Sequence, residues 1–149
     1  MSAKHILACV DFSAHSTRSL AEVGEYARAN GSKVTLIHVS DPQAFIPPQA
    51  VLQPASTNDE ATHRAALAKL RDQNLGDIEV DIAVLVDHAP AKAICDYAEE
   101  HGVDLIVVGS HGRGGVERWL IGSVAERVVR HASSNVYVVR QRLQTASLP

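Results

Sequence analysis

Residues 104–140 of this 149-residue chain read DLIVVGSHGRGGVERWLIGSVAERVVRHASSNVYVVR. The stretch begins with the apolar run DLIVVG (104–109), which is typical of a strand buried on both faces. A glycine-rich loop follows, then apolar residues at helical spacing from Ser123, and then a second apolar run, NVYVVR (135–140). Strand, loop, helix and strand in this order predict a right-handed crossover between two parallel strands.

The same alternation extends through the rest of the chain. Three more apolar runs predict strands: HILACV (5–10), KVTLIHV (33–39) and IEVDIAVLV (78–86). Helices are expected between them, after the turn-like DFSAHS, after the capping box that begins at Thr57, and from Pro90. The chain therefore has the order β-α-β-α-β-α-β-α-β.

This order predicts an α/β fold: an open, doubly wound, five-stranded parallel sheet with helices on both faces. The length suits one domain over residues 1–149, in which 41–57 form a proline-rich loop and 141–149 a polar tail. Such sheets bind ligands beyond the carboxyl ends of their strands, where the winding direction reverses. We therefore expect the site in the loop after the first strand, which carries Asp11, and in the glycine-rich loop after the fourth.

Composition excludes several classes of protein. A formal net charge of −3 with 21% charged residues gives no general bias towards nucleic acid or membranes. No run approaches the roughly 20 apolar residues that span a bilayer, and the N-terminus does not look like a signal peptide. Neither the two cysteines nor the eight histidines show metal-ligand spacing. We expect a cytoplasmic protein that has no metal site of its own, does not insert into membranes and binds no nucleic acid.

The glycine-rich loop has the composition of a phosphate site. Its glycines allow backbone N–H groups to approach an anion closely, and Gly122-Ser123 opens a helix whose first N–H groups are unpaired. A phosphate chain would be clasped between these two sets of donors. Arg113 and Arg118 would add positive charge, and the Ser123 hydroxyl a direct hydrogen bond.

A purely structural role explains the same residues. Glycine-rich loops often only turn a chain, and Ser123 with Glu126 forms an S-x-x-E capping box that would occupy the hydroxyl. Asp11 likewise has two roles open to it, as a cap of the first helix or as a ligand of a sugar. The usual P-loop is absent, because no Gly-Lys-Ser/Thr follows the glycines.

The chain resembles the universal stress protein family. The resemblance is carried by VDFS after the first strand, IHV at the end of the second, and VVGSHGRGGVERWLIGSVAERVV before VYVVR. It covers nearly the whole chain apart from the proline-rich loop and the tail. The ATP-binding branch of that family is marked by Gly-x2-Gly-x9-Gly-Ser/Thr, and this chain has Gly109, Gly112, Gly122 and Ser123 at those positions.

The resemblance implies a ligand and a set of contacts. Asp11 would contact the ribose of ATP, and the backbone of Val10 and Val39 would line the adenine; Mg²⁺ is expected with the nucleotide. Ribose and phosphates would be held by Gly109, His111, Gly112, Gly122, Ser123 and Val124. Phe12 stands where relatives often have a small residue, and its ring is expected under the base or partly inside the pocket.

The resemblance also implies a homodimer, formed by antiparallel pairing of the last strands from Val136 to Val139. We favour an ATP-holding regulatory module in the stress response, whose loops change with the nucleotide and alter contacts with an unknown partner protein. A low-turnover ATPase or phosphotransfer enzyme is the alternative, with Asp11 and His111 activating the nucleophile and Arg113 stabilising charge. A nucleotide-free dimeric scaffold is the third candidate. No catalytic set is evident by spacing, so we expect no efficient turnover.

Overall fold

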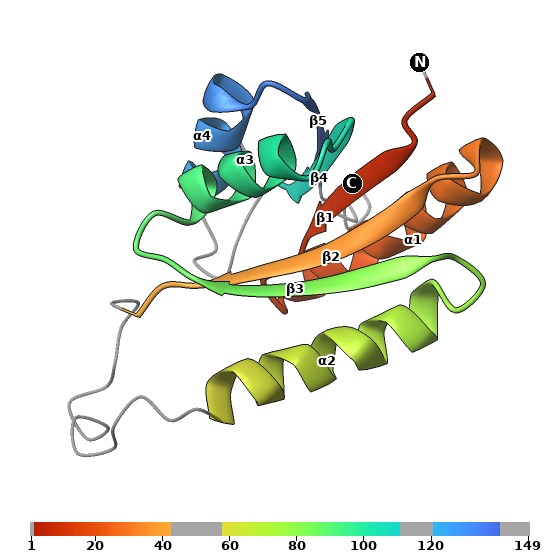
Figure 1. Ribbon diagram of the computed structural model, residues 1–149, viewed down its shortest axis with the longest axis horizontal. Coiled ribbons are helices and arrows are strands. Elements are labelled where there is room, and N and C mark those ends of the chain that lie inside the picture. The colour runs from red at the N-terminus through yellow and green to blue at the C-terminus, as the bar shows by residue number, and fades with distance from the viewer. Residues whose placement is uncertain (1, 43–57, 111–120, 141–149) are drawn as a thin grey trace, which may run out of the picture.

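The computed structural model describes residues 2–42, 58–110 and 121–140, so most of the predicted proline-rich loop and all of the tail lie outside the described residues. Strands and helices alternate in the predicted order (Figure 1). The elements are β1 (His5–Cys9), α1 (Ala14–Asn30), β2 (Lys33–Ser40), α2 (Asn58–Asn74), β3 (Val80–Val86), α3 (Pro90–Glu100), β4 (Leu105–Gly109), α4 (Ser123–His131) and β5 (Asn135–Val139).

The five strands form one parallel sheet in the order β3-β2-β1-β4-β5. The chain winds outward from β1 to β3, returns to pair β4 with β1, and ends at β5 on the other edge. The winding direction therefore reverses between β1 and β4, which is where a doubly wound sheet binds its ligands. The predicted fold class is confirmed.

Two hydrophobic cores lie on opposite faces of the sheet. On one face, α1 and α2 contribute Leu20, Val23 and Leu67 to a core with alternate residues of the strands. On the other face, α3 and α4 contribute Ile94 and Val128 to a second core. Figure 1 shows the two helix pairs on either side of the sheet. The described part of the chain contains no helix that is long and apolar enough to cross a membrane.

The helices differ in how they end and in how much of their surface they bury. Gly31 ends α1 in the left-handed conformation (φ 63°), which glycine adopts without steric cost. His101 and Val129, at the ends of α3 and α4, are exposed. His101 caps α3 beyond its packed face, and α4 buries only the narrow stripe of Ala125 and Val128.

At the amino-terminal edge of the sheet, where its strands begin, hydrogen bonds join side chains to the backbone of neighbouring segments. The Asp104 carboxylate, just before β4, accepts hydrogen bonds from the N–H groups of Lys4 (2.9 Å) and His5 (3.0 Å) at the start of β1. Ser134 Oγ, before β5, donates to the Val103 carbonyl (2.8 Å). These contacts hold neighbouring strands together where the ladder begins.

Candidate functional site

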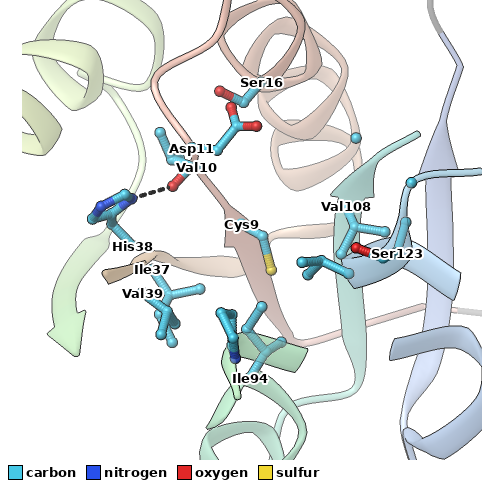
Figure 2. A pocket seen from close by; sticks show the side chains of 15 residues that line it. Cys9, Val10, Asp11, Ser16, Ile37, His38, Val39, Ile94, Val108 and Ser123 are labelled. Atoms are coloured by element: carbon cyan, nitrogen blue, oxygen red, sulfur yellow. Dashed lines mark hydrogen bonds between the residues drawn. The ribbon is translucent and has the colours of Figure 1, made fainter. Parts of the chain in front are cut away.

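A cavity of about 310 Å³ opens at the carboxyl ends of the strands around the point where the winding reverses (Figure 2). The volume is in the range of small-molecule sites. The residues that line it come from β1, β2, β4, α1, α3 and α4 and are Cys9, Val10, Asp11, Ser16, Ile37, His38, Val39, Pro90, Ile94, Val108, Gly109, Gly122, Ser123, Val124 and Ala125.

Most of the residues predicted to bind a ligand meet in this cavity. Those that line it are Val10, Asp11, Val39, Gly109, Gly122, Ser123 and Val124, although the segments that carry them are far apart in the sequence. His111, Gly112 and Arg113 lie outside the described residues. The sheet topology gathers these residues, because parallel strands direct all their carboxyl ends to one edge.

The start of α4 supplies one end of the cavity. The Gly122 N–H donates to the Ser110 carbonyl (2.6 Å), which holds the first turn of α4 directly beside the end of β4. Gly122 is the N-cap, and no side chain of the described residues caps the helix. The N–H groups that follow, on Ser123, Val124 and Ala125, have no carbonyl of their own helix to bond, and these residues line the cavity. This end of the cavity suits an anion.

Ser123 is not engaged in the capping box that its sequence allows. It is the first residue of α4 and not the residue before it, so its side chain does not take the N-cap position. Glu126, the other half of the pattern, forms an ion pair with Arg130 (2.8 Å). In Figure 2 Ser123 is drawn among the residues of the cavity wall.

Asp11 lies between the end of β1 and the start of α1. Its Oδ1 accepts a hydrogen bond from the Ser13 N–H (2.8 Å). Ser13, and not Asp11, is the N-cap of α1, and its hydroxyl accepts from the Ser16 N–H (3.3 Å). The half-buried carboxylate is therefore held in place in the cavity wall, close to Ser16 in Figure 2.

The opposite end of the cavity is apolar. It lies where the hydrogen-bond ladder between β1 and β2 stops. Its wall includes Ile37 and Val39 of β2 and Ile94 of α3, which Figure 2 draws near one another. The Val10 N–H donates to the Ile37 carbonyl (2.8 Å), and the Val10 carbonyl accepts from His38 Nδ1 (2.7 Å). An apolar wall beside strand peptide groups suits a flat heterocycle with polar edges.

Phe12 is not among the residues that line the cavity, so of the two expected positions for its ring the structure excludes the one inside the pocket. Phe12 has a positive φ (63°), uncommon for a residue with a bulky side chain, and this turns its ring towards β2. The ring centroids of Phe12 and His38 are 4.5 Å apart, and His63 of α2 lies 4.5 Å from His38 on the same criterion. Phe12 and His63 also stack, with centroids 5.6 Å apart, so the three rings form one cluster and Phe12 leaves the cavity open.

Cys9 is the thiol among the described residues of the wall. Burial raises the pKa of the Cys9 thiol strongly, and the negative charges of Cys95 and Asp11 add to the effect. Cys9 therefore stays a neutral thiol and acts as a small apolar wall residue. Within the described ranges, no three His, Cys, Asp or Glu side chains gather closely enough to hold a metal ion. The geometry suits holding a ligand.

Eight wall residues were not predicted as site residues: Cys9, Ser16, Ile37, His38, Pro90, Ile94, Val108 and Ala125. For His38, a usable signal was its place next to Val39 in a largely apolar strand. Pro90 and Ile94 reach the site only because α3 crosses above the end of β2, which depends on tertiary packing. Ser16 lies one turn inside α1, and nothing in the local sequence marks it.

Comparison with known proteins agrees with this architecture. Universal stress protein MJ0577 of Methanocaldococcus jannaschii is 28% identical over 157 residues, which covers 93% of this chain and 96% of that protein. Its solved structure gives a TM-score of 0.75 at 27% identity, over 97% of this chain and 100% of that one.

Two further structures share the fold at 23% identity. One is a universal stress protein in complex with cAMP (TM-score 0.71; 94% of this chain, 98% of that chain). The other is from Archaeoglobus fulgidus in complex with dAMP (TM-score 0.64; 93% and 98%). The universal stress protein family itself matches residues 2–140. The chain belongs to the universal stress protein family.

Proposed function

We propose that this protein binds ATP, with Mg²⁺ on its phosphates, in the cavity between β1 and β4. The observation that carries the proposal is the polarity of the cavity, which has an apolar wall with strand peptide groups at one end and an uncapped helix start at the other. Adenine needs the first environment and a phosphate chain needs the second. Asp11 also lines the cavity, where its carboxylate would meet the ribose that joins the two parts.

Each part of the nucleotide has a chemical partner. The Val39 peptide offers an N–H and a carbonyl, which match N1 and the N6 amino group of adenine. The Asp11 carboxylate is an acceptor for ribose hydroxyls. The N–H groups and hydroxyl at Ser123 suit a phosphate oxygen. His111, Gly112 and Arg113, which the resemblance and the loop composition assign to the ligand, complete the proposed set.

The neighbours support an adenine nucleotide. Universal stress proteins of this fold have been solved with cAMP and with dAMP, so the fold accommodates an adenine base and a phosphate. The complete Gly-x2-Gly-x9-Gly-Ser motif of this chain favours ATP, because it adds a second run of backbone donors next to α4.

We further propose that the protein works as a nucleotide-dependent regulatory module in stress response, as a homodimer. β5 is the edge strand next to β4 in the described sheet, and an antiparallel copy of Val136 to Val139 would pair along its outer side. Nucleotide binding would order the segments around the cavity and thereby change the surface offered to a partner protein.

The proposal is tested on freshly purified protein. The protein is denatured, and the released nucleotide is identified and counted by chromatography and mass spectrometry. ATP near one molecule per chain is the expected result, and it would also show that hydrolysis is slow. ADP or AMP would favour the low-turnover enzyme. No nucleotide, together with no binding of added Mg-ATP in calorimetry, would refute ATP binding and favour the scaffold.

A further inference from the structure

We infer that His38 is a positioning residue for base recognition. Its imidazole donates a hydrogen bond to the Val10 carbonyl and so leaves the N–H and carbonyl of Val39 available to the base. The inference rests on the proposed nucleotide binding and names the residue that gives the site its preference for adenine. It follows from the direction of the peptide groups along β2 and from the packing of the His38 ring.

Successive residues of β2 direct their peptide groups to opposite neighbours. The N–H of Val34 and the carbonyl of Ser40 bond towards β3. The N–H of Lys33 and the carbonyl of Ile37 bond towards β1. Val39 follows Ile37 by two residues, so its N–H and carbonyl also point to the β1 side.

A regular ladder would use that N–H within the sheet. After the bond from the Val10 N–H to the Ile37 carbonyl, the next bond of a parallel ladder joins the Val39 N–H to the Val10 carbonyl. In the described part of the chain, the β1–β2 ladder ends before that bond. The Val10 carbonyl accepts from His38 Nδ1 at 2.7 Å instead, as the dashed line in Figure 2 shows.

The His38 ring is fixed in this role by its surroundings. His38 is 9% exposed, and its ring packs against both Phe12 and His63, whose own ring centroids are 5.6 Å apart, so that the three rings form one cluster. His63 is itself tied to β2, since its Nδ1 lies 3.2 Å from Ser40 Oγ. Because a carbonyl only accepts, His38 must carry its proton on Nδ1. The bond from His38 therefore stands at the Val10 carbonyl in place of the extra ladder bond, and the N–H and carbonyl of Val39 are left at the apolar end of the cavity.

The first test compares two nucleotides in three proteins. Inosine carries N1–H and a carbonyl where adenine carries a bare N1 and an amino group, so ITP mismatches both groups of Val39. Dissociation constants for Mg-ATP and Mg-ITP are measured by calorimetry for the wild type, His38→Leu and His38→Asn. Asparagine Nδ2 is attached at the same position as histidine Nδ1 and can donate to Val10, whereas leucine cannot.

We expect the wild type and His38→Asn to prefer ATP over ITP by about tenfold, and His38→Leu to lose most of that preference through weaker ATP binding. An equal loss for both nucleotides would indicate a merely structural role and overturn the inference. So would a preference that persists in His38→Leu.

The second test needs no nucleotide and therefore separates this inference from the proposed function. Amide hydrogen exchange at Val39 is followed by NMR in the nucleotide-free proteins. We expect fast exchange in the wild type and His38→Asn, and exchange slowed about tenfold or more in His38→Leu, where the Val10 carbonyl can take the Val39 N–H. Equal exchange in all three would refute the role of His38 even if ATP binds. If no protein binds ATP but exchange changes as expected, the proposed function alone fails.

Discussion

The strands of the parallel sheet all begin at one end, the amino-terminal edge, and all finish at the other, the carboxyl-terminal edge. These two ends use polar groups in opposite ways. At the amino-terminal edge the polar side chains bond to backbone: Asp104 to the start of β1, and Ser134 to the residue before Asp104. At the carboxyl-terminal edge, the ladder ends at Val10 and the first turn of α4 has no side-chain cap from residues 2–42, 58–110 or 121–140. At the amino-terminal edge the hydrogen bonds join neighbouring strands, whereas at the carboxyl-terminal edge donors and acceptors face the cavity.

This contrast separates stability from binding within one small fold. Substitutions at the amino-terminal edge should change the free energy of unfolding and leave ligand affinity intact. Substitutions at the carboxyl-terminal edge should do the reverse. Stability and function are often traded at binding sites, because the groups that meet a ligand are unsatisfied without it.

The largest effect is expected from Gly122→Val. Gly122 has φ −57° and ψ 155°, which any residue adopts, so the change adds bulk beside the phosphate end without backbone strain. We expect ATP affinity to fall by about a hundredfold or more, with loss of several phosphate contacts. Gly76→Val is the matched control, because a Cβ there meets only the Asp72 carbonyl at 3.4 Å. Unchanged affinity in calorimetry would exclude phosphate binding at α4.

Asp11→Ala tests the middle of the cavity. Loss of a hydrogen bond from ribose to a half-buried carboxylate should weaken ATP by about 1–3 kcal/mol, measured as a change in dissociation constant. Asp11→Asn keeps an oxygen for the Ser13 N–H and should retain more affinity. If both variants bind ATP like the wild type, Asp11 serves only the turn before α1.

Asp104→Asn tests the other edge. The N–H groups of His5 and Lys4 hold the pKa of Asp104 below its usual value, so the carboxylate stabilises the fold above about pH 4 and loses this contribution as the pH falls further. Because Asp104 is exposed, we expect only about 1 kcal/mol, or roughly 2–4 °C in Tm at pH 7. The variant should match the wild type more closely near pH 3. A changed ATP affinity would break the separation between the edges.

The smallest effect concerns the two cysteines. Burial raises the pKa of both Cys9 and Cys95, so iodoacetamide should label each slowly at pH 7.5. Cys9 lines the cavity, whereas Cys95 lies on α3 in a separate surface groove. Saturating Mg-ATP should slow the labelling of Cys9 by a few-fold and leave Cys95 as an internal control, as peptide mass spectrometry would show. Protection of Cys95 alone would place the ligand in the groove instead.

The fold could be predicted because each strand and helix has a strong local signal. Apolar runs such as DLIVVG are long enough to indicate buried strands, and Gly31 marks a helix end by its backbone freedom. The site residues at the carboxyl ends of single strands, such as Asp11 and Gly109, could be predicted from the sheet topology. Ile94 and the ring pair around His38 did not, because they depend on how α3 and α2 pack on the sheet.

The interpretation of Ser123 shows a second limit of sequence reasoning. The S-x-x-E pattern predicts a cap equally well, and only the observed start of α4 at Ser123 decides against it. A shift of one residue in a helix boundary therefore changes a structural hydroxyl into one that lines the cavity. The hydrogen bond from the Gly122 N–H to the Ser110 carbonyl holds the start of α4 in place, and no local sequence pattern pairs these two residues.

The most direct test of the contrast is an NMR titration of the nucleotide-free protein with Mg-ATP. Backbone amides are assigned, and their shifts are compared between the two edges of the sheet. We predict large changes at Val10, Asp11, Val39 and Gly122 to Val124, and almost none at Lys4, His5 and Asp104. No change at the carboxyl-terminal edge, or changes concentrated at the amino-terminal edge, would contradict the account.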